Sequence, residues 1–465
     1  MDNKQLLSSF KNIVLSFLLL LIFGSAFSQK GVFETMWDRS INNNDTRPTW
    51  FSVGDDPEPS YNGTERGISY SATTGHLYVC SRNQGIPSIH IINPITGEDI
   101  GDVFTNGIEN GSDSGMEGGG YPLNNIVTTE GGQIVACNMT LASGPPTAEG
   151  WIKAFRVYKW SYESVMPEMI IDYQEGGYRL GDKFSVFGDL SGDARIYAVP
   201  GENNKVLKWT VTGGIVNDTP EVITLQGVTS VGTSPVVAEV PGTSGNFYVS
   251  GKGFLPTYFS SDGTNLTQIA VSPGPGRICG RLAKINNELY MALYQGANGD
   301  NQNAILINMT DHGENVGDDD IYGTTPSLSN TVTAWGEGAV DLAIVNDTMR
   351  VFVCAPDIGI AGYKAADLIS GVKNLNTENI RLSNYPNPFS SQTTIEYTVP
   401  SSLNEAVTIS IYDLSGKLVR EINNTNYTHG KNTFSFNAGN LPNGIYTYKL
   451  KAGKYSDENK MLIIK

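Results

Sequence analysis

The feature that most constrains the fold of this chain is a short apolar and aromatic triplet that recurs six times. Successive copies lie 57, 62, 51, 42 and 62 residues apart. A repeat of this length with one short strand per copy is typical of a propeller whose blades carry loop insertions. The copies are Leu77–Val79, Ile134–Ala136, Ile196–Ala198, Phe247–Val249, Leu289–Met291 and Val351–Val353.

Each triplet lies inside a longer pattern of strands and turns. A turn signal precedes most triplets and another apolar run precedes the turn, so each unit is predicted to begin as a β-hairpin. The expected first strands are Gly67–Tyr70, Asn125–Val127, Phe184–Phe187, Val236–Ala238, Ile278–Ile285 and Ala339–Val345. Third strands are expected at Ser88–Ile92, Ala154–Trp160, Val206–Trp209, Thr257–Phe259 and Ala304–Asn308. The predicted fold class is all-β, with a six-bladed β-propeller over residues 30–365 and a linker over 366–378.

A propeller has to close its ring, because an open ring leaves two sheet edges unpaired. The segment Thr49–Val53 precedes the first unit, and we expect it to supply the outer strand of the last blade. The 52 glycines, 22 prolines and only 17% charged residues suit many short strands joined by turns.

The net charge of −16 is spread unevenly. Residues 1–29 carry +1 and residues 378–465 carry +2, which leaves −19 for the segment between them. An acidic surface of this kind repels phosphate backbones and anionic lipid headgroups, so no nucleic-acid or peripheral membrane partner is predicted. The same charge also keeps an exported protein soluble, and this second interpretation needs no partner at all.

Residues 1–28 have the layout of a signal peptide. Lys4 and Lys11 precede an apolar core from Ile13 to Phe23, and Ala26 and Ser28 occupy the small-residue positions of a cleavage site before Gln29. The alternative is an uncleaved anchor, but the apolar core is shorter than the ~20 residues of a membrane span. We expect no transmembrane segment in the mature protein.

Four cysteines in an exported chain could form two disulfides. Cys80, Cys137 and Cys354 each follow directly after a triplet, at equivalent positions of different units. Such positions are too far apart for a bond that needs Cα atoms within about 7 Å. These cysteines, and Cys279 on a first strand, are therefore interpreted as small buried residues.

Few residues in the chain suit catalysis. None of the four histidines is spaced from another as metal ligands are, and no Gly-x-Ser-x-Gly motif or phosphate-binding loop is present, so a Ser-His-Asp hydrolase is hard to build. Asp318–Asp320 and the turn from Asp189 to Asp193 offer oxygens of the kind that Ca²⁺ binds, but neither has the spacing of a twelve-residue calcium loop. No cofactor and no metal site is predicted. Carboxylate pairs for sugar hydrolysis remain open, since they are set by separation in space.

The residues just ahead of the first strands predict a binding site. In a propeller these positions ring one mouth of the central channel, and three of the six are cations in an otherwise acidic segment. We therefore expect a polar or anionic ligand at this mouth. The predicted ligand-binding residues are Arg66, Asn125, Lys183, Ser234, Arg277 and Glu337.

The composition changes from Asn379 onward, where lysines return and short alternating strands follow one another. The expected strands are Thr394–Val399, Val407–Tyr412, Lys417–Ile422, Thr433–Phe436, Ile445–Lys451 and Lys460–Ile464. They predict a small immunoglobulin-like β-sandwich over residues 379–465. Pro386 and Pro388 cannot donate hydrogen bonds in a sheet, so we expect them at the entry of an edge strand.

This tail resembles the type A sorting domains of type IX secretion. The resemblance rests on four segments in order, namely residues 381–389, 411–419, 441–450 and 460–465, and within them it singles out Pro386, Asn387, Pro388, Gly416, Gly444, Tyr446, Lys460 and Lys465. It implies recognition by an outer-membrane translocon, cleavage of the tail by a sortase and attachment to surface lipopolysaccharide or release. The implied location is the extracellular space or the outer-membrane surface, reached through the periplasm. The alternative is an ordinary immunoglobulin-like adhesion module.

The segment before the tail resembles an uncharacterised family of secreted Bacteroidetes proteins with propeller-like repeats, on the whole-chain layout and the run Gly188–Asp193. That resemblance implies no activity. The first hypothesis is a surface or secreted protein that binds a glycan, peptide or other polar ligand at the channel mouth. Alternatives are an extracellular polysaccharide hydrolase or lyase, for which converging carboxylates are expected at the mouth, and a structural adhesion protein, for which large exposed aromatic patches are expected.

Overall fold

The computed structural model describes residues 31–52, 54, 62–108, 121–145, 153–271, 277–285, 288–296, 302–310, 316–329, 337–369, 382–399, 406–414, 416–424, 427–428, 430–452 and 455–465. The predicted signal peptide and most of the predicted linker lie outside these residues. The chain divides into two compact units, Met1–Gly371 and Val372–Lys465.

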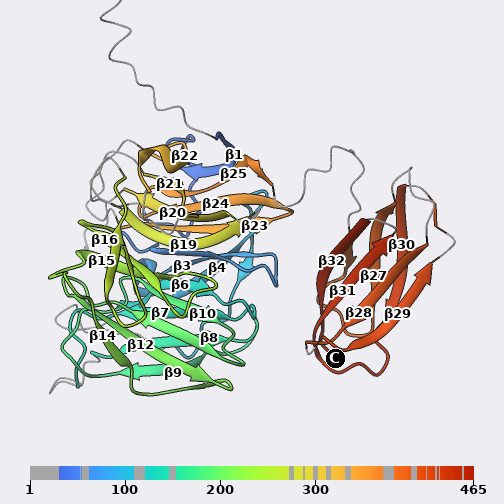
Figure 1. Ribbon diagram of the computed structural model, residues 1–465, viewed down its shortest axis with the longest axis horizontal. Helices are drawn as coiled ribbons and strands as arrows, with labels where there is room; N and C mark the ends of the chain where they lie inside the picture. Colours follow the sequence, from blue (N-terminus) through green and yellow to red (C-terminus); the bar gives the residue numbers. More distant parts are fainter. Residues whose placement is uncertain are drawn as a thin grey trace, which may run out of the picture. The chain divides into compact units, whose positions relative to one another are not determined.

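The described residues of the first unit form six antiparallel sheets, and five of them are built from strands that follow one another in the sequence (Figure 1). The first three sheets are β2 (Gly67–Tyr70), β3 (Leu77–Ser81), β4 (Ser88–Ile92) and β5 (Asp99–Asp102); β6 (Tyr121–Thr128), β7 (Ile134–Met139), β8 (Phe155–Trp160) and β9 (Glu168–Tyr173); and β10 (Phe184–Gly188), β11 (Ala194–Ala198), β12 (Lys205–Thr212), β13 (Ile215–Val216) and β14 (Glu221–Thr224).

The other three sheets are β15 (Thr233–Glu239), β16 (Phe247–Lys252), β17 (Phe254–Phe259) and β18 (Asn265–Gln268); β19 (Arg277–Ile285), β20 (Glu288–Gln295), β21 (Asn303–Asn308) and β22 (Ile321–Thr324); and β23 (Ala339–Val345), β24 (Thr348–Ala355) and β25 (Gly359–Ile369) with β1 (Phe33–Ser40). The described residues of this unit also contain two short 3₁₀ turns, η2 (Asn83–Gly85) and η3 (Asp318–Asp320). Among the described residues no helix is long and apolar enough to span a membrane.

The predicted hairpins are confirmed strand by strand. Every expected first strand lies within the first strand of a sheet, and every apolar triplet lies within the second. The first strands contact one another in cyclic order, because β2 contacts β6 and β23, β10 contacts β6 and β15, and β19 contacts β15 and β23. The first strands of the six sheets therefore face a common centre.

The last sheet is completed by the N-terminal strand β1, which pairs with β25 from Phe33 opposite Ala365 to Ser40 opposite Gly359. In Figure 1 the blue β1 lies beside the orange β25. The prediction that Thr49–Val53 would supply this strand is wrong, since Thr49–Ser52 form a turn and a bend. Length and burial explain the outcome, because β1 buries Phe33 and Trp37 and has eight residues to pair, whereas 49–53 has only five.

Apolar clusters fill the spaces between neighbouring sheets. One cluster joins Val79 of β3 to Phe352 of β24, and another joins Tyr78 of β3 to Trp160 of β8. Residues on the two faces of the second strand β3 thus belong to two different cores. This is why the triplets consist of apolar and aromatic residues. The second strands are buried on both faces for this reason.

The second unit consists of two antiparallel sheets that share one core. The sheets are β26 (Leu382–Tyr385), β27 (Gln392–Val399) and β30 (Gly430–Asn437), and β29 (Leu418–Asn424), β28 (Val407–Tyr412), β31 (Gly444–Ala452) and β32 (Tyr455–Ile463). Six of these strands were expected from the sequence. Pro386 and Pro388 follow the edge strand β26 instead of opening it, which corrects their predicted place; the missing N–H groups are harmless there as well.

Candidate functional site

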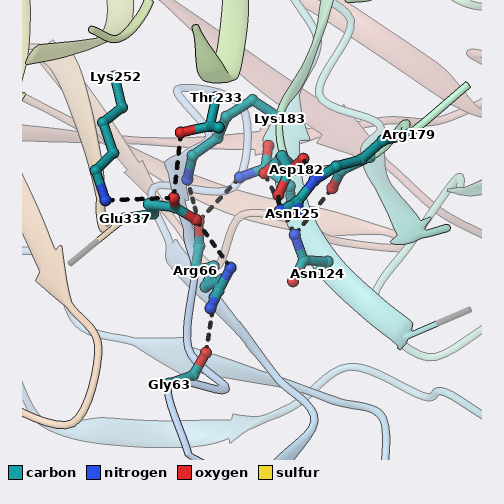
Figure 2. A network of polar contacts seen from close by, with 11 residues as sticks. Gly63, Arg66, Asn124, Asn125, Arg179, Asp182, Lys183, Thr233, Lys252 and Glu337 are labelled. Carbon is teal, nitrogen blue, oxygen red and sulfur yellow. Dashed lines mark hydrogen bonds and ion pairs between the residues drawn. The ribbon is translucent and has the colours of Figure 1, made fainter. Parts of the chain in front are cut away.

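A network of polar side chains lies where the first strands begin (Figure 2). Arg66 precedes β2, and its guanidinium lies 3.2 Å from Glu337 Oε2, which precedes β23. The Nε of Arg66 also donates to the Gly63 carbonyl at 2.8 Å. Two positions 271 residues apart in the sequence thus form an ion pair between the neighbouring first strands β2 and β23, and both side chains are largely buried.

Two further predicted residues converge on the backbone of Arg66. Asn125 Nδ2 donates to the Arg66 carbonyl at 3.0 Å, and the Lys183 ammonium donates to the same oxygen. Arg66, Asn125, Lys183 and Glu337 are therefore brought together from four different sheets. Three of them precede a first strand, whereas Asn125 lies within β6, which begins earlier than expected, at Tyr121.

The other two predicted residues stand differently. Ser234 lies at the second position of β15 with φ +48°, and its buried hydroxyl has no hydrogen-bond partner in the described structure. The backbone of Arg277 opens β19, but its side chain lies outside the described residues.

Burial governs the charge of Lys183. The side chain is almost fully removed from water. This desolvation, together with the nearby Arg66 charge, lowers the pKa of Lys183 to about 8. Within the described residues its one hydrogen-bond acceptor is the Arg66 carbonyl, and no carboxylate lies within ion-pair distance of its Nζ. The ammonium is thus poorly compensated by the protein.

The network includes residues that sequence analysis did not single out. Lys252 Nζ lies 3.8 Å from Glu337 Oε1, and Thr233 Oγ1 lies 3.5 Å from the same oxygen. Arg179 holds Asp182 through two bonds of 2.6 Å. Asp182 directly precedes Lys183, and Thr233 directly precedes Ser234. A wider sequence window around each first strand would therefore have included both residues. Lys252 ends a second strand, and only the fold brings it to the mouth.

A cavity continues from this network into the centre of the first unit. Residues from the first strands of all six sheets line it, and most of the lining is apolar. Arg281 of β19 crosses this space, with Nε 3.5 Å from Asp341 Oδ1 and with another nitrogen donating to the Thr128 carbonyl at 2.8 Å. Asp341 in turn accepts from the Tyr70 amide at 2.7 Å. The sequence pattern hides this pair, because both residues sit inside apolar strands.

The entry to β2 is held by a buried carboxyl. Glu65 is fully buried and accepts hydrogen bonds from Ser81, Ser52 and Thr64 at 2.6 to 2.7 Å. The Ser52 hydroxyl also lies 2.7 Å from Asp357 Oδ1, and it has one proton for two carboxyl groups. Burial raises the pKa of Glu65, so we assign the shared proton to this side chain.

The cysteine prediction is confirmed for the three cysteines whose side chains are described. Cys80, Cys137 and Cys354 are buried and unbridged. Each thiol donates to a backbone carbonyl beside the mouth, at Gly67, Gly181 and Glu65 respectively. Burial raises the pKa of all three thiols, so they are inert packing groups. The side chain of Cys279 lies outside the described residues.

Ser88, His90 and Asp102 form a hydrogen-bonded row on β4 and β5, which sequence analysis did not anticipate. The Ser88 hydroxyl lies 3.0 Å from His90 Nε2, and His90 Nδ1 lies 2.7 Å from Asp102 Oδ1. Trp50 stacks on the imidazole at 3.8 Å. Asp102 is 67% exposed, and burial lowers the pKa of His90 despite this carboxylate. The residue order that makes a nucleophilic serine is present, on the third and fourth strands of the first sheet.

The acidic turns make contacts within the protein. Asp318–Asp320 make up the 3₁₀ turn η3, and Asp189 Oδ1 accepts from the Ser191 amide at 2.8 Å and from Gln133 at 2.6 Å. No group of three or more potential ligands for a metal ion occurs among the described residues.

In the second unit, the motif around Asn387 is joined to the last strand. Asn387 Nδ2 donates to the Lys460 carbonyl at 3.1 Å, and Asn387 Oδ1 accepts from the Leu462 amide at 2.8 Å. Two other tail residues of the resemblance close turns, since Tyr446 donates to the Pro442 carbonyl at 3.0 Å and Gly416 has φ +78°. Lys465 donates through its amide to Asn443 at 2.9 Å. The first and last motifs of the tail thus form one continuous surface around β32.

Two family models match the chain. Residues 383–465 match the secretion system C-terminal sorting domain, and residues 124–273 match a domain of unknown function, DUF8500. No curated protein sequence matches the chain.

Several solved structures resemble it. A DUF4623 family protein from Bacteroides eggerthii is 16% identical with a TM-score of 0.52, over 68% of this chain and 73% of that one. PorZ, a surface component of the type IX secretion system of Porphyromonas gingivalis, is 13% identical with a TM-score of 0.33, over 86% of this chain and 51% of that one. An exo-β-1,3-galactanase from Phanerochaete chrysosporium is 10% identical with a TM-score of 0.34, over 74% and 95%. The first likeness concerns the fold alone, and no activity is carried over from any of them.

The family match covers the residues whose order and contacts are described above, from the motif around Asn387 near its start to the terminal strand β32 at its end. A sorting domain of this kind directs the protein that carries it to the cell surface or the extracellular space. The chain therefore carries a type IX secretion C-terminal sorting domain, behind a first unit that contains a DUF8500 segment.

Proposed function

We propose that the first unit is a six-bladed β-propeller, that the tail is an immunoglobulin-like sandwich read by the type IX translocon and sortase, and that the exported protein binds an anionic or polar ligand at the mouth of the propeller channel. The cyclic order of the first strands supports the propeller. The ligand is a glycan or a peptide.

One observation carries the binding proposal: the side chains at the mouth are net positive, whereas the unit around them is net negative. The network in Figure 2 contains four cationic side chains, Arg66, Arg179, Lys183 and Lys252, and two carboxylates, Asp182 and Glu337. The unit around it is strongly acidic. A positive opening in a negative surface attracts anions. Both the affinity and the association rate for an anionic ligand therefore increase.

The arrangement favours binding over sugar hydrolysis. A glycosidase needs two carboxyl groups that face the substrate. Asp182 is buried and held by both bonds of Arg179, so Glu337 is the carboxylate of this network that retains exposure. A mixed polar mouth of this composition fits recognition.

The test is a glycan and peptide array with the full-length secreted protein, followed by affinity measurements. Lys252→Ala removes a 35% exposed cation at the mouth, and we expect affinity to fall about fivefold to tenfold, as for one charge-assisted hydrogen bond. Lys208→Ala is the matched control, because this lysine pairs with Glu221 on an outer strand. An array without any bound ligand, or equal affinities for the two variants, contradicts mouth binding.

A second candidate function, ester hydrolysis at Ser88, is favoured by the Ser88, His90 and Asp102 row. With Nδ1–H directed at Asp102, Nε2 is free to accept the Ser88 proton, as a nucleophilic serine requires. A fluorophosphonate probe that labels the wild type but neither Ser88→Ala nor His90→Gln supports it. Absence of labelling reduces the row to a structural contact.

A further inference from the structure

The cavity behind the mouth carries an inference that rests on the proposed function and names the chemistry of its ligand. We infer that this cavity receives one carboxylate group of the ligand, held by Lys183 and the Ser185 hydroxyl. Six polar residues line the cavity among apolar ones: Ser69, Asn125, Lys183, Ser185, Arg281 and Asp341.

The first argument is the uncompensated charge of Lys183. An ammonium group has three donors, and within the described structure one of them has an acceptor. A buried cation without a paired anion costs several kcal/mol of folding free energy. A ligand anion that enters the cavity removes this cost, so its binding energy includes the relief of a penalty that is already present in the free protein.

The second argument is an unused hydrogen-bond donor beside that charge. Lys183 directly precedes β10, and Ser185 is the second residue of that strand. Both residues line the cavity. Ser185 is 8% exposed, and its hydroxyl has no partner among the described residues. Buried hydroxyls are nearly always hydrogen-bonded, so this hydroxyl is a donor that a ligand in the cavity can use.

The charge of the lining decides which anion fits. Arg281 is already paired with Asp341, so these two cancel and leave the single charge of Lys183. One positive charge balances a carboxylate, which carries one negative charge. A phosphate dianion would bring a second charge close to Asp341, and a neutral group would leave the ammonium uncompensated.

The apolar remainder of the lining sets a further limit. Ile68, Ile126, Val236 and Ile278 surround the polar groups from four different sheets. A group that enters has to give up its water on these sides, which favours a compact head that the two donors satisfy fully. The rest of the ligand then lies at the mouth, against Lys252 and Glu337.

The experiment measures binding of glucuronate, glucose and inorganic phosphate to the full-length protein by calorimetry. We expect glucuronate to bind at least tenfold more tightly than glucose or phosphate. Lys183→Met is expected to weaken glucuronate binding about tenfold or more, and Ser185→Ala about threefold to tenfold. Wild-type affinity should also fall as the pH rises past about 8, where free Lys183 loses its proton, and this pH dependence should disappear in Lys183→Met.

Loss of folding does not obscure the result, because Lys183→Met removes a buried charge and Ser185→Ala removes an unpartnered hydroxyl. Equal binding of glucose and glucuronate, no detectable glucuronate binding, or unchanged affinity in both variants overturns the inference. The proposed function survives such a failure if an array ligand is still weakened by Lys252→Ala. It fails separately if no ligand responds to that variant.

Discussion

At the residue scale, the mouth depends on buried ionisable side chains whose pKa is shifted by burial. Glu65 is one of them, and it holds the segment that presents Arg66 through Ser52, Thr64 and Ser81. Three hydroxyl groups and the Ser52 amide would normally favour a carboxylate, but complete burial outweighs them and raises the pKa of Glu65. The neutral form also agrees with the single proton of Ser52, which can then be donated to Asp357.

This assignment predicts the sign of a pH effect. A carboxyl whose pKa is higher in the folded than in the unfolded state stabilises the protein below the unfolded value of 4.5, and this contribution is lost as the pH rises through the folded value. The free energy of unfolding of the wild type should therefore fall as the pH rises above 4.5. In Glu65→Gln that part of the decline should be missing.

The measurement is urea unfolding at a series of pH values, followed by tryptophan fluorescence. All six tryptophans lie before residue 372, so the signal reports the first unit alone. Glu34→Gln, a change at an exposed carboxyl on β1, is the control that should keep the wild-type profile. If the free energy of unfolding of Glu65→Gln and of the wild type changed with pH in the same way, Glu65 would not be the group that holds the proton.

At the element scale, β1 joins the two ends of the first unit. Trp37 of β1 is buried between the first and last sheets, where its indole N–H donates to the Pro94 carbonyl at 3.0 Å and its ring stacks near Phe352 at 6.3 Å. Glycines make room for it, since a Cβ at Gly97 or Gly362 would come within 2.7 Å of the indole ring. The strand pairing and the indole together close the array of sheets.

Trp37→Ala should therefore destabilise the first unit by about 3–5 kcal/mol, the usual cost of truncating a buried Trp. Gly97→Ala should destabilise it through the same contact from the opposite side. Chemical denaturation checks both, with Glu34→Ala on the exposed face of β1 as a control that changes stability by less than about 0.5 kcal/mol. A small effect of Trp37→Ala would mean that β1 does not contribute to closure.

At the scale of the whole molecule, the two units have separate tasks. The tail carries the sorting domain, and its first and last motifs meet through Asn387 and β32. A receptor that reads both motifs at once would meet them on one surface. The acidic first unit is the part that is delivered.

Asn387→Ala should leave the first unit intact and impair export, because both hydrogen bonds to β32 are lost from one side chain. Cell fractionation should show the variant retained in the periplasm, as for a chain that ends before residue 382. Asn423→Ala on β29, which removes an exposed contact with Thr408 of β28, is the matched control and should be exported normally. Normal export of Asn387→Ala would show that this contact is not part of the signal.

The hairpins and the sorting tail could be predicted from the sequence alone, because both depend on local residue patterns. Apolar runs with a period of two and intervening turns identified the hairpins, and the spacing of motifs from Arg381 to Lys465 identified the sorting tail. The entry positions of the first strands then named four residues that do meet, Arg66, Asn125, Lys183 and Glu337.

The tertiary structure decided what depends on partners distant in the chain. Only pairing across more than three hundred residues shows that β1, and not Thr49–Val53, completes the last sheet. Burial of Lys183 and Glu65, the Arg281 and Asp341 pair, and the row from Ser88 to Asp102 likewise follow from which strands become neighbours. A side chain's charge and hydrogen bonds are set by its surroundings, and in a closed array of sheets those surroundings come from other repeats.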